Sequence, residues 1–182
     1  MCSVYIARMN TEFTRPIKAR HIHEDVQTHE VAADEAARAA LAARFGLPGI
    51  AHLSGVFVLR HERGGIIGAT LAMRARVTQT CVVSLEPFET TLAEDSVLRF
   101  VPAREPVAEG GEEEDVTPES LDGPDEIPYA NDIIDLGEAL AEQLALALPP
   151  YPRKPGAALP DEAVDDSANP FALLKGKFGK PG

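Results

Sequence analysis

Apolar and polar residues alternate along the middle of the chain, and this alternation predicts a β-sheet. Between residues 66 and 85, one set of alternate positions is mainly apolar and the other is mainly polar. Successive side chains of a strand point to opposite faces, so the pattern predicts one long strand with a buried face. The apolar set is Leu71, Met73, Ala75, Val77, Cys81, Val83 and Leu85, whereas Gln79 and Val82 break the alternation.

Further strands are expected on both sides of this long strand. Residues 50–62 form a β-rich run, and the pair Gly64-Gly65 after it suits the positive φ angles of a tight turn. Another strand is expected within residues 86–101. Because short links between consecutive strands favour hairpins, we expect a mainly antiparallel sheet that is curved or partly barrel-like.

The segment EAARAALAARF, residues 35–45, is predicted to be a helix because it consists largely of strong helix formers. Asp34 is suited to cap its N-terminus, and Gly46 stands where a glycine commonly ends a helix. Pro48 prevents the helix from continuing. Its apolar stripe is narrow and consists mainly of Ala37, Leu41 and Phe45.

A second helix is predicted over residues 132–148, with Asp132 or Asn131 as its N-cap and Pro149-Pro150 as its end. Its apolar stripe at helical spacing is Ile133, Leu136, Leu140, Leu144 and Leu148. Asp135, Glu138 and Glu142 form an acidic stripe. This acidic face is either solvated, as on an ordinary core-packing helix, or it contacts a basic partner.

Together these elements indicate an α+β fold with a mainly antiparallel sheet, two helices and an acidic disordered insert. We expect one domain over residues 1–148, interrupted by an acidic loop at residues 103–131. Residues 149–182 form a Pro- and Gly-rich tail with a short apolar docking patch, NPFALL. No apolar run approaches the ~20 residues of a membrane span. With only two cysteines and no apolar N-terminal stretch, a reducing, cytoplasmic location is expected.

The formal net charge of −12 is concentrated in one segment. From Glu105 to Asp135 the chain has 12 acidic residues and no basic residue, so the other 17 acidic residues are balanced by 17 basic ones. A dense acidic segment attracts basic proteins and repels phosphate backbones. For this segment, the charge therefore favours a basic protein partner over nucleic acid.

The sequence contains none of the catalytic or metal-binding motifs HExxH, CxxC, GxSxG or the P-loop. His21, His23 and His29 share strand parity, which leaves open a metal site, although their charged neighbours equally suit a solvated strand or loop. Cys81 is in phase with the apolar set and is expected to be a buried, structural thiol. A small metallo- or thiol-dependent enzyme is the alternative from another class. We expect no catalytic residue, no metal, no cofactor and no small-molecule substrate.

Arg74 and Arg76 share the polar face of the long strand. They are candidates for contacts with RNA phosphates, and the alternative is ordinary solvation of an exposed sheet face. No aromatic residues interleave with them as stacking platforms would.

Three stretches form a distinctive combination: ARVTQTCVVSLEPFE, EIPYANDIIDLGEALAEQLALALPPYPRKPGA and NPFALLKGKF. Together they resemble the YceD family, also called large ribosomal RNA subunit accumulation protein. The first resembles a strand that ends in Cys-x-x-Cys/Ser-Leu-x-Pro, the second an Asp-Leu-Gly-Glu helix before a Pro-rich turn, and the third the usual ending. Ser84 stands where many members have a second cysteine, which speaks against a zinc or dithiol role for this pair.

The resemblance implies a non-enzymatic role in accumulation of large-subunit ribosomal RNA, and hence in ribosome assembly. The implied partner is a precursor of the large ribosomal subunit, contacted through a basic ribosomal protein or through RNA. The expected partner-binding residues are Asp135, Glu138, Glu142, Tyr151 and Arg153, and the expected RNA-contacting residues are Arg74 and Arg76.

Overall fold

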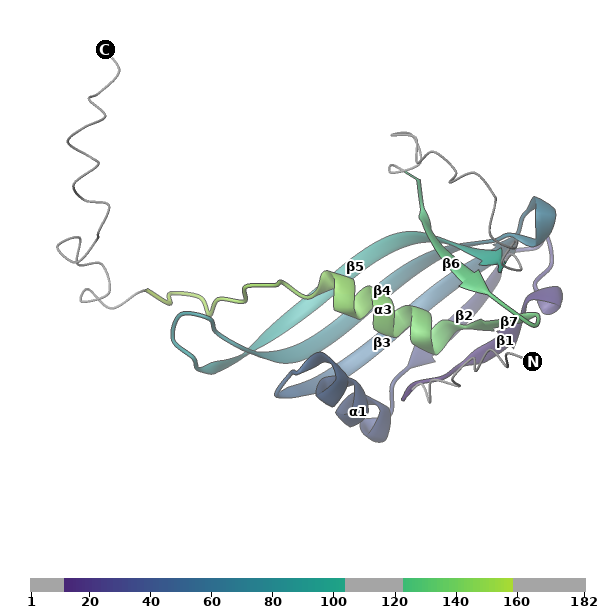
Figure 1. The fold of residues 1–182 in the computed structure, drawn as a ribbon. Coiled ribbons are helices and arrows are strands. Elements are labelled where there is room, and N and C mark those ends of the chain that lie inside the picture. Colours follow the sequence, from purple (N-terminus) through teal and green to yellow (C-terminus); the bar gives the residue numbers. More distant parts are fainter. Residues whose placement is uncertain (1–11, 104–122, 159–182) are drawn as a thin grey trace, which may run out of the picture.

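The computed structural model describes residues 12–103 and 123–158, in which a helix lies across one face of the main sheet (Figure 1). The α+β class predicted from the sequence is confirmed. Most of the predicted acidic loop and the apolar patch NPFALL lie outside the described residues.

The main sheet has five strands in the order β2-β3-β4-β5-β6. Neighbouring strands are antiparallel except for β5 and β6, which are parallel. Because β2 and β6 are not paired with each other, the sheet is open and does not close into a barrel. The strands are β2 (Gln27–Ala32), β3 (Gly49–His61), β4 (Ile67–Thr80), β5 (Pro87–Pro102) and β6 (Asp125–Tyr129).

Two helices, a two-stranded ribbon and two short turns complete the described fold. The ribbon pairs β1 with β7 in antiparallel fashion. The predicted caps of the first helix are confirmed, since the Asp34 carboxylate accepts a hydrogen bond from the Ala37 N–H at 2.9 Å and Gly46 has a φ of 64°. The elements are β1 (Pro16–Lys18), η1 (Ala19–His21), α1 (Glu35–Phe45), η2 (Arg63–Gly65), β7 (Ile133–Asp135) and α3 (Leu136–Ala147).

Helix α3 packs on the inner face of the sheet, against β2, β3 and β4 as well as β1 (Figure 1). The odd-numbered residues of β4 point to this face and are all buried, from Ile67 to Gln79. Leu140 of α3 lies over Gly55 of β3, where a Cβ atom would be 2.8 Å from Cδ1 of both Leu140 and Leu71. The glycine therefore lets the helix approach the sheet closely.

Helix α3 begins later than the sequence predicted. Ile133–Asp135 pair with β1 as a strand, and Asp135 rather than Asp132 caps the helix. Asp132 has a φ of 61°, and its carboxylate accepts a hydrogen bond from the Arg20 N–H at 2.9 Å. The assignment of Ile133 to the buried apolar stripe was wrong as well, because in the short strand Ile133 is 47% exposed and its neighbour Ile134 is buried. The strand β1, whose pairing makes residues 133–135 a strand, lies near the N-terminus.

The predicted acidic loop at residues 103–131 contains a strand at its C-terminal end, so that boundary was wrong. Residues 125–129 form β6, which pairs in parallel with the end of β5. Ile127 and Tyr129 alternate with polar residues or proline, and the Tyr129 hydroxyl donates to the Gly65 carbonyl oxygen at 2.7 Å. The high density of acidic residues in this segment predicted a loop, so the alternation was missed.

The long central strand ends at Thr80, short of the predicted residue 85. Residues after it form a turn in which the Cys81 N–H donates to the Glu86 carbonyl at 2.9 Å. Leu85, predicted to be on the buried face, has a φ of 59° and is 76% exposed. Gln79, which broke the apolar pattern, instead points into the core and is 3% exposed.

We expect Gly137→Ala to destabilise the fold. A Cβ atom at residue 137 would overlap the Phe13 carbonyl oxygen and lie 2.9 Å from the Arg15 nitrogen. These are backbone atoms, which cannot rotate away, so the helix must shift. The free energy of unfolding, measured in urea, is expected to fall by about 1–3 kcal/mol even though alanine is the better helix former.

Gly49→Ala is the matched control for this substitution. The nearest atom to its added Cβ, Thr78 Oγ1, lies at 3.9 Å, an ordinary contact, so its effect should stay within about 0.5 kcal/mol. An unchanged or higher urea midpoint for Gly137→Ala would contradict the close contact.

Candidate protein-binding groove

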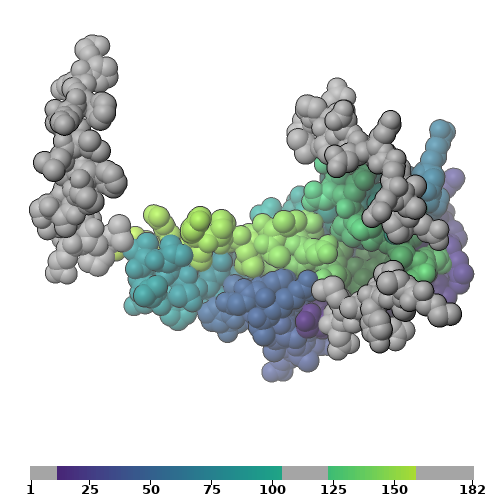
Figure 2. Space-filling model, in the orientation of Figure 1, coloured from purple at the N-terminus to yellow at the C-terminus, as the bar shows by residue number. Residues whose placement is uncertain are grey.

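A groove of about 410 Å³ lies between α3 and β6. Its apolar floor includes Phe100 of β5, Ile127 of β6 and Ala139 of α3, and Figure 2 shows α3 and the β6 region on the same face of the molecule. Helix α3 packs mainly over β2 to β4, so the groove occupies the edge of the inner face, next to the helix. The remaining lining residues are Glu126, Pro128, Tyr129, Ile134, Asp135, Glu138 and Glu142.

Four carboxylates line the groove, and three of them are the predicted acidic stripe of α3. The Asp135 carboxylate is bound within the fold, because one of its oxygens accepts hydrogen bonds from three backbone N–H groups. The donors are Arg15 at 2.8 Å, Gly137 at 2.9 Å and Glu138 at 3.2 Å. Such a carboxylate both caps the helix and joins it to the N-terminal segment.

Glu138 is also bound within the fold. The Arg44 guanidinium of α1 donates to both of its carboxylate oxygens, at 3.1 and 2.7 Å. Arg44 lies 3.6 Å from Glu12 as well, and the hydrogen bonds with Glu138 raise the pKa of Arg44. This bidentate pair fixes the end of α1 to the first turn of α3.

Glu142 lies one turn further along α3 and has no such partner among the described residues. Burial raises the pKa of its carboxyl group, and the neighbouring charge of Glu138 adds to the rise, while Arg44 opposes it. Glu126 of β6 is exposed at the other wall. Glu126 and Glu142 therefore leave the groove with negative charge that the described cations do not neutralise.

The other predicted partner-binding residues lie elsewhere. Tyr151 and Arg153 follow the C-terminal end of α3, in the segment that passes the turn after β4. Both are exposed, Tyr151 to 77%. The structure thus brings Asp135, Glu138 and Glu142 into one groove but separates them from Tyr151 and Arg153. Glu126 and Phe100 were not predicted from the sequence as part of this site.

Arg74 and Arg76 lie on the outer face of the sheet, opposite to α3. Both are exposed, but the Arg74 guanidinium is 3.8 Å from Asp95 and donates to the Met73 carbonyl oxygen at 2.8 Å. Across the sheet, His52 of β3 stands opposite Arg76. Positive and negative groups are therefore mixed on this face.

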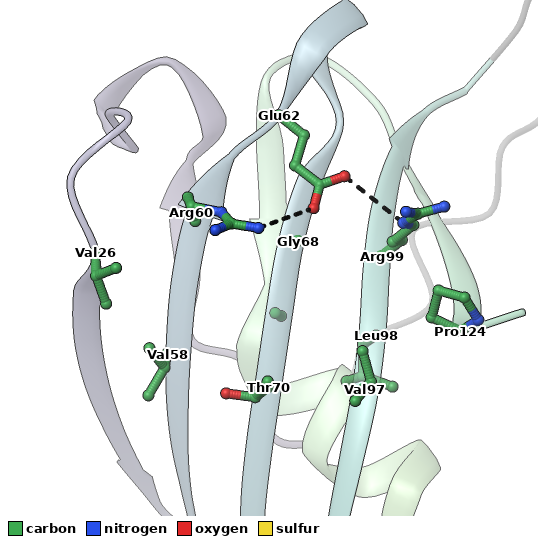
Figure 3. Close-up of a pocket in the computed structure, with 11 residues that line it drawn as sticks. Val26, Val58, Arg60, Glu62, Gly68, Thr70, Val97, Leu98, Arg99 and Pro124 are labelled. Carbon is green, nitrogen blue, oxygen red and sulfur yellow. Dashed lines mark ion pairs between the residues drawn. The ribbon is translucent and has the colours of Figure 1, made fainter.

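A shallow hollow on the same outer face, shown in Figure 3, contains a second cross-strand cluster. The Glu62 carboxylate lies over Gly68 and between Arg60 of β3 and Arg99 of β5, at 3.7 and 3.6 Å. Exposed pairs of this kind contribute little, about 0–1 kcal/mol each. The cluster links three neighbouring segments of the sheet. Its Glu62 carboxylate also neutralises part of the positive charge on this face.

Cys81 is the first residue of the turn after β4, and its side chain is 0% exposed. The Ser84 N–H donates to its Sγ at 3.4 Å. Hydrogen bonds from Ser84, through side chain and backbone, and from the Lys154 and Val83 N–H groups lower the pKa of the Cys81 thiol to about 6, against the opposing effect of burial. Donors from both the turn and the segment after α3 thus converge on one sulfur.

No metal-ligand cluster and no membrane helix occur in the part of the chain that the structure describes. Within it, no three His, Cys, Asp or Glu side chains gather in a group suited to a metal ion. None of its helices is long and apolar enough to cross a bilayer.

The chain belongs to the YceD family. The family model, described as large ribosomal RNA subunit accumulation protein YceD, matches residues 69–174, which is more than half of the chain. The matched range begins in β4 and includes both walls of the groove. Neither the curated proteins nor the solved structures include a match to this chain.

The lowered pKa of Cys81 predicts a pH-dependent contribution to stability. The folded pKa of about 6 lies below the ~8.5 of an unfolded thiol. The thiolate contribution is therefore fully present above pH ~8.5 and is lost as the pH falls through 6. In a Cys2→Ser background, urea unfolding should show that Cys81→Ala loses more stability at pH 8.5 than at pH 5.5. An equal loss of stability at both pH values would contradict a stabilising thiolate at Cys81.

Proposed function

We propose that this protein is a non-enzymatic assembly factor of the large ribosomal subunit that holds a basic segment of a ribosomal protein in the groove between α3 and β6. It would do so in the cytoplasm, on a precursor of the subunit. The family match supports the role in accumulation of large-subunit ribosomal RNA. The observation that carries the finer proposal is the pair of uncompensated carboxylates, Glu126 and Glu142, above an apolar floor.

A lysine or arginine side chain suits this combination of groups. Its aliphatic stem would lie along Ile127 and Tyr129, which are partly exposed, and its charged end would reach Glu126 or Glu142. A cation bound close to Glu142 would favour the charged carboxylate and so oppose the effect of burial, which raises the pKa of this group. The partner should consequently bind less well as the pH falls through that raised pKa.

In this role, the groove would protect the basic segment during assembly. Ribosomal proteins need basic segments to neutralise phosphates, and the same segments bind any RNA without sequence preference. A groove that covers such a segment delays these unspecific contacts until the correct RNA site displaces it. The acidic residues between 105 and 122 would add attraction over a longer range.

Direct RNA binding through Arg74 and Arg76 has less support. Asp95 pairs with Arg74, and Glu62 is shared by Arg60 and Arg99, so the outer face offers no continuous positive surface. RNA binding that weakens on Arg74→Ala/Arg76→Ala, with no effect of the groove carboxylates, would favour this alternative.

We expect Glu126→Gln/Glu142→Gln to weaken binding of a fluorescently labelled Lys/Arg-rich peptide at least tenfold, which corresponds to about 1.4 kcal/mol. The reason is the loss of the two charges that the described residues leave unpaired. Fluorescence anisotropy at several salt concentrations should also show a shallower salt dependence for this variant.

The control variant is Glu24→Gln/Glu30→Gln, which changes the net charge equally at exposed positions away from the groove. It should retain nearly the wild-type affinity. If both double variants weaken binding to the same extent, the peptide responds only to net charge and the groove is not its site.

A further inference from the structure

Exposed apolar side chains that do not line the groove lie in the last turn of α3, in the segment after it and in the turn between β4 and β5. Among the described residues, the three most exposed large apolar side chains are Tyr151 at 77%, Leu85 at 76% and Leu146 at 73%. Val82, in the same turn as Leu85, is 45% exposed. We call these four residues the apolar end. Apolar groups gathered in this way commonly mark a surface that another segment covers.

The apolar end is held together by contacts between two distant segments. The Val82 N–H donates to the Pro152 carbonyl oxygen at 2.9 Å, and the Lys154 ammonium donates to the Glu86 carboxylate at 2.7 Å. Figure 1 shows the segment after α3 passing the turn between β4 and β5. The turn with Val82 and Leu85 therefore lies beside the segment that contains Tyr151.

The left-handed conformation of Leu85 closes the turn after β4, where the Leu85 N–H donates to the Cys81 carbonyl oxygen at 2.9 Å, but this role does not require a leucine side chain. Its φ of 59° lies in the left-handed region, which a leucine side chain disfavours and which glycine or asparagine adopts more readily. The backbone strain and the exposure of the side chain both disfavour leucine at this position. A leucine that destabilises its own turn therefore suggests that its side chain contacts a segment outside the described fold.

We propose that the apolar end is the docking site for this chain's own segment 170–174, with the sequence PFALL. The described chain stops at Ala158, only four residues after Lys154, which is anchored to the turn. At about 3.3–3.6 Å per residue, the 12 residues from 159 to 170 span up to ~40 Å, so Phe171 reaches the apolar end easily. Residues 171–174 are the one run of four consecutive apolar residues after Ala158.

Two further observations favour this occupant over a separate protein. Tethering gives the segment a high effective concentration at a nearby surface, so a small apolar contact is sufficient. The family match extends to Leu174 and stops there, so it includes the whole of the segment. The docking does not depend on the proposed function, because no residue of the apolar end lines the groove.

The test compares methyl NMR spectra of the full chain and of Phe171→Ser/Leu173→Ser/Leu174→Ser. The methyl resonances of Val82, Leu85 and Leu146 should differ between the two proteins, whereas those that line the groove should not. Val164→Ser, in the intervening residues, is the control and should leave the spectrum of the apolar end unchanged. No difference at the apolar end, or a difference that depends on protein concentration, would overturn the proposal, the latter because a second copy would then be the occupant.

A second variant separates docking from folding. Leu85→Asn suits the left-handed backbone, so the turn should be retained and the urea midpoint should be unchanged or higher. A peptide of residues 167–174 with blocked ends, which has no charged side chain, should bind to full-length Phe171→Ser/Leu173→Ser/Leu174→Ser at least tenfold more weakly when Leu85→Asn is also present. Equal peptide affinity with and without this substitution would contradict docking at the apolar end. Because neither readout uses a basic peptide, both results are independent of those for the groove.

Discussion

The backbone of the first turn of α3 is in direct contact with the backbone of the N-terminal segment, and this contact fixes the helix whose carboxylates line the groove. Gly137 has no side chain to separate the helix from Phe13, and the Asp135 carboxylate binds N–H groups of both segments. The Leu136 N–H also donates to the Arg15 carbonyl oxygen at 3.1 Å. The helix is thereby anchored at its start, and its remaining length lies across the sheet.

This anchoring divides the acidic stripe of α3 into two parts. Asp135 and Glu138 are used within the fold, the first as a cap and the second in the bidentate pair with Arg44. The Asp-Leu-Gly-Glu signature therefore has a sufficient structural explanation. Glu142 projects from the same face without a matching cation, and β6 brings Glu126 to the opposite wall. The same helix thus stabilises the fold and brings an acidic side chain without a matching cation to the groove.

Local patterns in the sequence predicted the elements whose signals lie within a few residues. The alternation in β4 and the Asp34 and Gly46 caps of α1 are of this kind. The spacing of Asp135, Glu138 and Glu142 also predicted that they share a face, and all three line the groove. The start of α3 was not predictable in this way, because a strand near the N-terminus decides it. Glu126 joined the site only through the parallel pairing of β6 with β5, which no local pattern reveals.

The most direct test of the link between groove and function is complementation in a strain that lacks this protein, with the ratio of large- to small-subunit ribosomal RNA as the readout. Wild-type protein and Arg74→Ala/Arg76→Ala should restore the ratio, whereas Glu126→Gln/Glu142→Gln, present at equal abundance, should leave it low. Full restoration by the groove variant would contradict the central claim that these two carboxylates hold the partner.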